Sequence, residues 1–204
     1  MSCPHRFLNY HVENSLCPNW EFDKLIIGTF NPSWNFSNSK PASYFYGRTM
    51  NNYFWDSLPL VFNQDGLRDE NKEKWIEFLK EQKIGLTDLV IDIIDADKNN
   101  KDHYCLLKSM TELNLTKFKN IAFNTQKIIS LIEEKKVSKI FITNQTAPKL
   151  FENEFLKIQT ACENQKKSFS RLLTPSSGAR FRLPKGTKII DGIVNDWKPK
   201  FGNE

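Results

Sequence analysis

The stretch 24–33, KLIIGTFNPS, decides the fold class that the sequence predicts. Its apolar run is ended by Gly28 and then by Pro32. Strands that are apolar on both faces are typical of a parallel sheet covered by helices. We therefore predict a buried strand over Lys24–Phe30, with the turn residues 31–33 at its carboxyl end.

Short apolar runs alternate with amphipathic segments along the rest of the chain. Further strands are expected at 86–94 (or a strand and a turn there), 120–124, 139–143 and 170–173, and helices at 52–62, 70–82, 103–113, 126–135, 147–154 and 189–198. This alternation predicts a three-layer α/β/α fold with a central, mainly parallel, four-stranded sheet. The 204 residues fit a single domain spanning 1–204.

The composition argues against several classes of protein. Hydrophobic residues make up 39% of the chain, which is enough for a sizeable core and too much for a disordered chain. No apolar run approaches the ~20 residues of a membrane-spanning helix, and the N-terminus lacks the apolar core of a secretion signal. We therefore expect a soluble, cytoplasmic protein. The absence of GxGxxG and of a P-loop argues against dinucleotide redox and phosphotransfer chemistry.

Metal and cofactor chemistry has little support in the sequence. The four cysteines, Cys3, Cys17, Cys105 and Cys162, are scattered and form no CxxC pair, so a zinc ribbon or redox dithiol is not expected. Distant thiolates could gather around an iron–sulfur cluster, but buried structural thiols are the simpler interpretation. With only three histidines, none of them in a motif, a multi-histidine metal site is not expected either. We expect no cofactor.

Positive charge is concentrated near the end of the chain. The net charge is +5, and the segment 166–200 alone carries nine basic residues against two acidic ones. Lys and Arg clustered in this way indicate either a solvated basic face or a contact with a polyanion such as nucleic acid. Composition alone leaves both interpretations open.

The ends of the predicted strands are the places to look for a ligand site, because ligands bind beyond the carboxyl ends of parallel strands. The segments at these ends, 31–33, 124–125, 144–145 and 174–180, are rich in amides and hydroxyls and poor in carboxylates. They contain no Ser-His-Asp or Cys-His set, which argues against acyl transfer. The loop 31–48 is long for a compact domain, which suggests a functional loop.

Several stretches together resemble the uracil-DNA glycosylase superfamily, especially its mismatch-specific and hypoxanthine-DNA glycosylase branches. They are LIIGTFNPS (25–33), YFYGRTMNNYFWDSL (44–58), IGLTDLVIDIIDADKNNKD (84–102) and LLTPSSGA (172–179). They follow the order expected for that superfamily and span about residues 24–198. The resemblance implies a base-excision repair enzyme that flips a deaminated or mismatched base out of DNA and hydrolyses its N-glycosidic bond. It also implies DNA, duplex or single-stranded, as the partner of a monomeric, cofactor-independent glycosylase.

The resemblance implies that an asparagine positions the water molecule that attacks the N-glycosidic bond. Asn52 matches by its distance to the following Phe-Trp pair, Asn51 matches by its distance from Tyr46, and Asn31 follows the first strand one residue later than in relatives. We expect Asn52 to be the main water-positioning residue, with Asn31 second. The competing interpretations are a helix N-cap for the pair and a turn-forming residue before proline.

Other residues are expected to hold the extruded base. The resemblance places Gly28 where the base pocket opens and makes the aromatic rings of Phe30, Phe45 and Tyr46 stacking platforms, with core packing as the alternative. Asn124 and Asn144, each at a strand end, are expected to read the base edge through an amide that both donates and accepts. An ordinary capping role is the alternative for both.

The resemblance makes the segment 174–182 the DNA-binding loop. Small residues let backbone N–H groups approach phosphates, and hydroxyls and arginines add donors and charge. The expected contact residues are Pro175, Ser176, Ser177, Gly178, Ala179, Arg180 and Arg182. In the uracil-specific branch a histidine precedes the Pro-Ser pair, and here Thr174 stands in its place. That departure predicts slow excision of uracil or a preference for another base.

Two other functions stay open at this point. One is a nucleic-acid binding module that has the same fold with weak or no catalysis. The other is a nucleoside hydrolase that uses the same pocket for small molecules. In either case the asparagines and the late serine–arginine loop have to face each other across one cleft.

Overall fold

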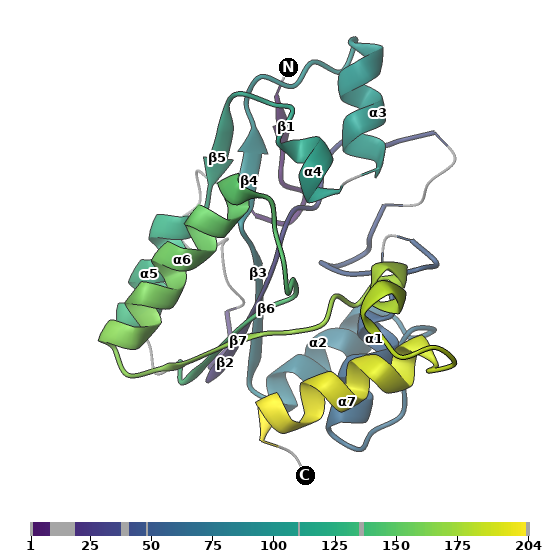
Figure 1. Ribbon diagram of the computed structural model, residues 1–204, viewed down its shortest axis with the longest axis vertical. Coiled ribbons are helices and arrows are strands. Elements are labelled where there is room, and N and C mark those ends of the chain that lie inside the picture. The colour runs from purple at the N-terminus through teal and green to yellow at the C-terminus, as the bar shows by residue number, and fades with distance from the viewer. Residues whose placement is uncertain are drawn as a thin grey trace.

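A four-stranded parallel sheet forms the centre of the computed structural model, which describes residues 2–8, 19–37, 41–47, 49–109, 111–134 and 137–202 (Figure 1). Its strands are β2 (Lys24–Gly28), β3 (Ile84–Asp88), β6 (Lys139–Ile142) and β7 (Ser168–Arg171), in the order β3-β2-β6-β7. All three strand pairs are parallel. The predicted α/β fold with a mainly parallel four-stranded sheet is confirmed.

A second, antiparallel sheet was not predicted. It consists of β1 (Cys3–Pro4), β4 (Val90–Ile93) and β5 (Ile121–Phe123), in the order β1-β4-β5. Of the two interpretations of 86–94, the single strand is wrong, because the chain leaves the parallel sheet at Asp88 and enters the second sheet at Val90. The predicted strand 120–124 exists as β5 but pairs in this second sheet, so its end is not an end of the parallel sheet.

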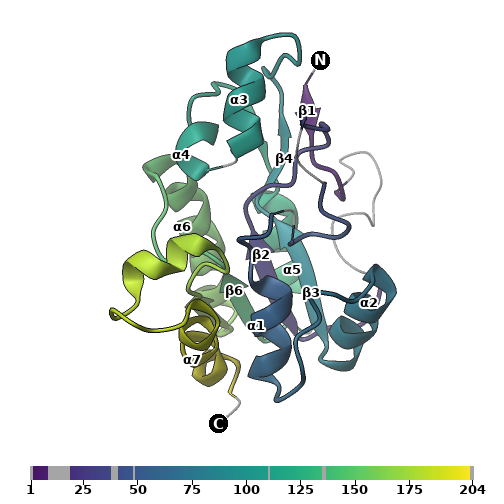
Figure 2. The ribbon, with the colours of Figure 1, turned by 90° about the vertical axis from the view of Figure 1, so that its right-hand side faces the viewer.

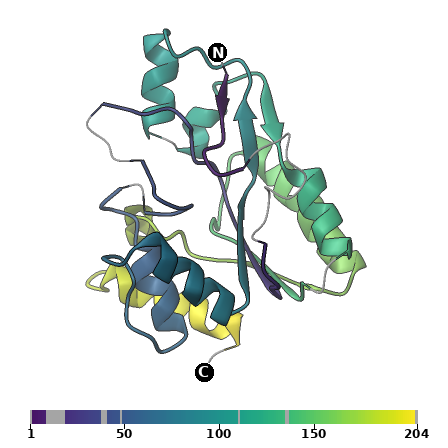
Figure 3. The same cartoon turned by 180° about the vertical axis from the view of Figure 1, so that it is seen from behind.

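Helices cover both faces of the parallel sheet and complete three layers (Figures 1 and 3). The helices are α1 (Phe54–Val61), α2 (Lys72–Glu81), α3 (Lys101–Ser109), α4 (Glu112–Leu115), α5 (Thr125–Glu134), α6 (Lys149–Asn164), η1 (Ser177–Arg182) and α7 (Ile189–Phe201). One core cluster joins α1, α2 and α7 to Ile26 of β2, and another joins α5 and α6 to the alternate residues Leu25 and Ile27. Because successive side chains of β2 point to opposite faces of the sheet, this strand contributes to both hydrophobic cores.

Local signals explain where several helices begin and end. The side chain of Asn71 accepts a hydrogen bond from Lys74 N and caps α2, and Gly202 ends α7 with a left-handed φ of +79°. The helix predicted at 147–154 continues to Asn164, because Phe155, Ile158 and Cys162 extend its buried stripe. Helices α3 and α4 lie beside the second sheet at the end of the molecule away from α7 (Figure 2).

Among the described residues, no helix combines the length and the apolar character that crossing a membrane requires.

Candidate active site

A buried carboxylate lies at the carboxyl end of β3. Asp88 Oδ2 is 2.7 Å from His5 Nε2 and 2.7 Å from Asn31 Nδ2. The exposed fractions are 1% for Asp88, 4% for His5 and 8% for Asn31, so the three side chains form a buried polar cluster. Burying a carboxylate is expensive unless its oxygens are hydrogen-bonded, and here two N–H groups converge on a single oxygen.

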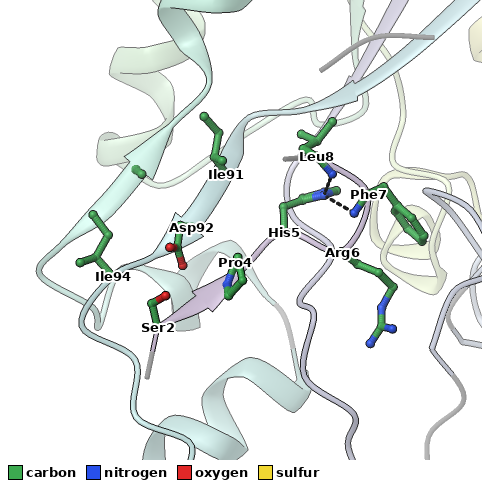
Figure 4. Close-up of a pocket in the computed structure, with 10 residues that line it drawn as sticks. Ser2, Pro4, His5, Arg6, Phe7, Leu8, Ile91, Asp92 and Ile94 are labelled. Atoms are coloured by element: carbon green, nitrogen blue, oxygen red, sulfur yellow. Dashed lines mark hydrogen bonds between the residues drawn. The ribbon is translucent and has the colours of Figure 1, made fainter. Parts of the chain in front are cut away.

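The hydrogen bonds of His5 fix its protonation state. Its Nδ1 accepts from the backbone N–H groups of Phe7 and Leu8, each at 3.0 Å (Figure 4). A nitrogen that accepts hydrogen bonds carries no proton, so the imidazole is neutral and holds its proton on Nε2. His5 therefore donates to Asp88 through Nε2–H, as Asn31 does through its amide.

Gly28 makes room for the second oxygen of the carboxylate. Gly28 in β2 is the register partner of Asp88 in β3. A Cβ at position 28 would lie 2.3 Å from Asp88 Oδ1 and 2.8 Å from the hydroxyl of Tyr46. Only glycine permits both groups to approach this backbone position so closely. The pocket-opening glycine of the sequence analysis therefore adjoins Asp88.

Tyr46 links this polar cluster to the start of α1. Its ring stacks on that of Phe54 with centroids 3.7 Å apart and planes 7° apart. Its hydroxyl is 3.2 Å from Thr143 Oγ1, just beyond β6. Burial, and to a lesser extent the charge of Asp88, raise the pKa of Tyr46 far above its ordinary value, so the phenol stays neutral. One face of the ring is covered by Phe54.

The other two predicted stacking platforms are core residues. Phe30 is 4% exposed, and its ring packs against His5 with centroids 5.8 Å apart. Phe45 is 5% exposed and contacts the rings of His5, Phe7 and Tyr44. Core packing, the alternative interpretation given above, fits both of them better than base stacking.

The asparagine stretch and the Pro-Ser loop are hydrogen-bonded to each other. Tyr53 N donates to Pro175 O at 2.6 Å, and Ser177 N donates to Asn51 O at 3.0 Å, which forms an antiparallel bridge between Asn52 and Ser176. Two stretches more than 120 residues apart in the sequence therefore form one rim beside the carboxyl edge of the sheet. Asn51 contributes its backbone carbonyl to this contact and is exposed.

The amide of Asn52 is held in place by the helix that follows it. Its Oδ1 accepts from Phe54 N at 3.1 Å, which is a capping contact at the start of α1. Arg68 donates to the backbone carbonyl of Asn52 at 2.5 Å and pairs with Asp56, which fixes the backbone at this point. An amide oxygen has two lone pairs, so this contact leaves one available for a water molecule.

In the Pro-Ser loop, residues 174–182, some residues are buried and anchor the loop, and others are exposed at its tip. Ser176 Oγ accepts from Gly178 N at 3.3 Å and contacts Thr174 Oγ1 at 3.0 Å, which starts the short helix η1. Of the predicted DNA contacts, Pro175 and Ala179 are buried and hold the loop. Those that reach solvent are Ser177, Arg180 and Arg182, and the neighbouring Phe181 is 92% exposed.

The amides of the two predicted base-reading asparagines are engaged in local structure. Asn124 is 1% exposed, and its Nδ2 donates to Thr87 Oγ1 at 3.1 Å and to Asp88 O at 3.0 Å, so it supports the end of β3 from behind. Asn144 Nδ2 donates to Glu112 Oε1 at 3.0 Å, and its Oδ1 accepts from Thr146 N at 3.0 Å. Capping and support are the contacts that the structure gives these side chains.

Three features of the site escaped the sequence analysis. The strand ends carry Asp88 and Glu112 close by, so they are not poor in carboxylates. His5 lies within the site, which corrects the expectation that no histidine lies near a motif. The sequence gives Asp88 no role, because nothing local shows that its side chain meets residues 5 and 31, and β1 is too short for a periodic pattern to reveal His5. The exposed Phe181 beside two arginines was visible in the sequence and was overlooked.

A cavity of about 680 Å³ lies on the second sheet and is lined in part by His5 of the buried polar cluster (Figure 4). Its walls include Ser2 and Pro4 from the N-terminal strand and Asp92 and Ile94 from β4 and beyond. Partial burial raises the pKa of Asp92 above its usual value. None of the predicted site residues lines this cavity.

The described residues contain no group of three or more His, Cys, Asp or Glu side chains placed to hold a metal ion. Cys3 and Cys162 are buried free thiols and Cys105 is an exposed one. Cys17 lies outside the described residues.

Comparison with solved structures identifies the fold. The solution NMR structure of a proposed uracil DNA glycosylase from Methanosarcina acetivorans superposes on this chain with a TM-score of 0.53. The chain has a uracil-DNA glycosylase-like fold. The match covers 88% of this chain and 91% of the archaeal one, at 17% sequence identity. No protein-family model and no curated protein matches the chain. At this identity the glycosylase-like likeness extends to the arrangement of helices and strands, and the function has to be argued from the site.

Proposed function

We propose that this protein is a monofunctional DNA glycosylase. It binds DNA as a monomer without a cofactor, takes a deaminated or mismatched base out of the helix, and hydrolyses the N-glycosidic bond. The transition state of this reaction carries positive charge on the sugar and negative charge on the leaving base. The enzyme therefore has to hold a water at the sugar, bind the phosphates beside it, and enclose the base.

The observation that carries the proposal is the pairing of residues 51–53 with residues 175–177. It joins a candidate water-positioning amide, Asn52, to a loop with small residues, hydroxyls and exposed arginines. In the proposed reaction Ser176 and Ser177 bind the phosphates that flank the extruded nucleotide. The free lone pair of Asn52 Oδ1 accepts a hydrogen bond from the water, whose own lone pair attacks the sugar carbon.

The part of the site around Tyr46 and Gly28 is suited to hold the base of the extruded nucleotide. Tyr46 stacks on Phe54, two residues beyond Asn52, and its hydroxyl reaches Gly28 and Thr143. In the proposal the face of Tyr46 opposite Phe54 stacks on the base, which contributes about 1–3 kcal/mol. Asn31, which is 8% exposed and whose Nδ2 donates to Asp88, acts in the proposal as a positioning residue rather than as the holder of the water.

An incision assay tests the proposal against its two alternatives. Labelled duplexes that contain uracil, hypoxanthine or a G·T mismatch at one position are incubated with the protein and then treated with alkali, which cuts the strand at abasic sites. Strand cleavage at the modified position, which is lost in Asn52→Ala, supports the glycosylase. Binding that weakens with salt but gives no cleavage on any duplex would favour the binding module. Release of free base from nucleosides alone would favour the nucleoside hydrolase.

A further inference from the structure

Arg68 contacts the asparagine stretch at three points. It lies in the connection between α1 and α2, and its guanidinium donates to the backbone carbonyl of Met50 at 3.0 Å and to that of Asn52 at 2.5 Å. Its Cζ lies 5.3 Å from the centre of the Tyr53 ring. The side chain of Arg68 therefore ties residues 50–53, which include the part that pairs with the Pro-Ser loop, to the connection between two helices.

Asp56, in the first turn of α1, orients this guanidinium. Nε of Arg68 donates to both carboxylate oxygens of Asp56 at 2.8 Å, and a terminal nitrogen also contacts Oδ2. The exposed side-chain fractions are 27% for Arg68 and 19% for Asp56, so the pair is largely covered. A guanidinium can bind one carboxylate and two carbonyls together, because its N–H groups point in fixed and different directions.

The backbone that carries Arg68 is itself held by α1 and α2. Leu67 N donates to Trp55 O at 2.7 Å, and Trp75 Nε1 donates to Leu67 O at 2.6 Å. The rings of Trp55 and Trp75 stack with centroids 4.7 Å apart and planes 9° apart. The position of Arg68 is therefore set by two packed helices.

The hydrogen bond to the Asn52 carbonyl bears on the amide of the same residue. The side-chain rotamers open to a residue depend on its own backbone dihedral angles. A rotation of the backbone at Asn52 would therefore move Oδ1, the atom proposed to hold the attacking water. A displacement of about 1 Å at such a group can lower a rate by about 100-fold.

We propose that Arg68, oriented by Asp56, is a positioning residue for base excision, because it holds the backbone of residues 50–53 so that Asn52 presents its amide to the water. This inference rests on the proposed function and adds a residue on which the rate of the chemical step depends. Loss of the contacts is expected to slow that step and to change DNA affinity little. The phosphate contacts proposed for Ser176 and Ser177 come from another part of the chain.

Arg68→Lys is the informative variant, because it keeps the positive charge and loses the planar group. One ammonium group cannot take over the fixed directions in which the guanidinium binds Asp56 and two backbone carbonyls. Arg171→Lys is the matched control. Arg171 also pairs with a carboxylate, that of Glu152 on α6, and its side chain is 25% exposed.

The experiment measures rate and affinity separately. Single-turnover excision is followed on the duplex that the wild type cleaves fastest, and affinity is measured with a duplex that carries a stable abasic-site analogue. Arg68→Lys is expected to lower the rate by about 10- to 100-fold and to change the affinity by less than about threefold. Arg171→Lys is expected to stay within about twofold of the wild type in both. Both variants are assayed at a temperature at which circular dichroism shows that they are folded.

Amide hydrogen exchange separates this inference from the proposed function. Arg68→Lys is expected to speed exchange of the Tyr53 N–H, which donates to Pro175 O, by about tenfold or more, and Arg171→Lys is expected to leave it unchanged. If the wild type excises no base, the glycosylase assignment fails, and the exchange of Tyr53 alone decides whether Arg68 holds residues 50–53.

Two results would overturn the inference in an active enzyme. One is an unchanged excision rate in folded Arg68→Lys, even if its stability is reduced, since that would mean a merely structural role. The other is a loss that appears in the affinity and not in the rate. If the wild type is inactive, unchanged exchange of Tyr53 overturns it. If Arg68→Lys does not fold, Asp56→Asn, which removes the charge that orients the guanidinium, is measured by the same criteria.

Discussion

The backbone N–H of Tyr53 donates a 2.6 Å hydrogen bond to the carbonyl of Pro175. This bond, with its neighbour between Ser177 and Asn51, holds the start of α1 against the start of η1. Helix α1 also packs against α7 on the same face of the sheet. The rim of the candidate site is therefore built on packed helices rather than on an isolated loop, which favours precise placement of Asn52 and Ser176.

Replacement of the water-holding amide is expected to remove activity and to leave the protein folded, although it also removes the capping hydrogen bond to Phe54 N. Asn52→Ala should lower single-turnover excision by at least about 100-fold, a loss typical of removing a group that acts in the transition state. The adjacent Asn51→Ala removes an exposed side chain and keeps the backbone contact, so its rate should stay within about twofold of the wild type. Equal losses in the two variants would contradict the assignment of Asn52.

The exposed aromatic ring of Phe181 is expected to fill the gap that an extruded base leaves in the duplex. Apolar side chains inserted between base pairs offset an unstacking free energy of a few kcal/mol. Phe181→Ala should slow excision from duplex DNA by about tenfold or more and leave single-stranded substrates unaffected. Leu156→Ala, which removes a 57% exposed side chain on α6, serves as the control. An equal loss on single and double strands would contradict this role.

The charge at the tip of the loop is expected to appear in the salt dependence of DNA binding. Each phosphate contact contributes about one unit to the slope of log Kd against log salt concentration. Arg180→Ala should therefore reduce that slope by about one. Lys157→Ala, on the opposite layer, removes an exposed charge that pairs with Glu154 and should leave the slope unchanged. A slope that responds to Lys157 and not to Arg180 would place the DNA on the other face.

The close approach at Gly28 is expected to make even a methyl group harmful. Gly28→Ala would place a Cβ 2.3 Å from Asp88 Oδ1 and 2.8 Å from the Tyr46 hydroxyl, so both side chains have to shift. Overpacking of this kind lowers the free energy of unfolding by about 1–3 kcal/mol. Denaturant unfolding measures the change, and Gly66→Ala, whose Cβ would have ordinary contacts of 3.4 Å, should be nearly neutral. Equal stability of both variants would contradict the geometry around Asp88.

The cysteine thiols are expected to be alkylated at different rates, and these rates test whether Cys3 and Cys162 are buried as the structure describes. Burial raises the pKa of Cys3 and of Cys162 to about 11, above the usual thiol value. At pH 8 their thiolate fraction is therefore very small, and it rises only as the pH approaches 11. Iodoacetamide at pH 8 should modify the exposed Cys105 before Cys3 and Cys162, as peptide mapping by mass spectrometry would show. Faster modification of Cys3 would mean that β1 is not packed as described.

The sequence carried enough information for the parallel sheet and not for the second sheet. The apolar run at Lys24–Gly28 and the helical periods around it are local signals, and they predicted the layers correctly. The change of sheet at Leu89 has only a weak signal, because Thr87 and Asp88 interrupt the apolar run but no glycine or proline marks a turn there. A two-residue strand such as β1 is formed by its partner, β4, and not by its own sequence.

The candidate site was predictable to a similar degree. The resemblance to glycosylases selected both stretches that form the rim, because their residue types are tied to chemistry. The polar cluster of His5, Asn31 and Asp88 was not predictable, because it depends on a contact across 83 residues between an N-terminal strand and a strand end. Contacts of that range are set by the tertiary fold, which local patterns do not encode.

The most direct test of the account is a crystal structure of the protein with a duplex that carries a stable abasic-site analogue. The account predicts that the extruded sugar lies between Asn52 and the Pro-Ser loop, with the flanking phosphates on the hydroxyls of Ser176 and Ser177. It also predicts that Phe181 occupies the vacated position in the helix. DNA bound over the second sheet, with the rim of residues 51–53 and 175–177 empty, would contradict it.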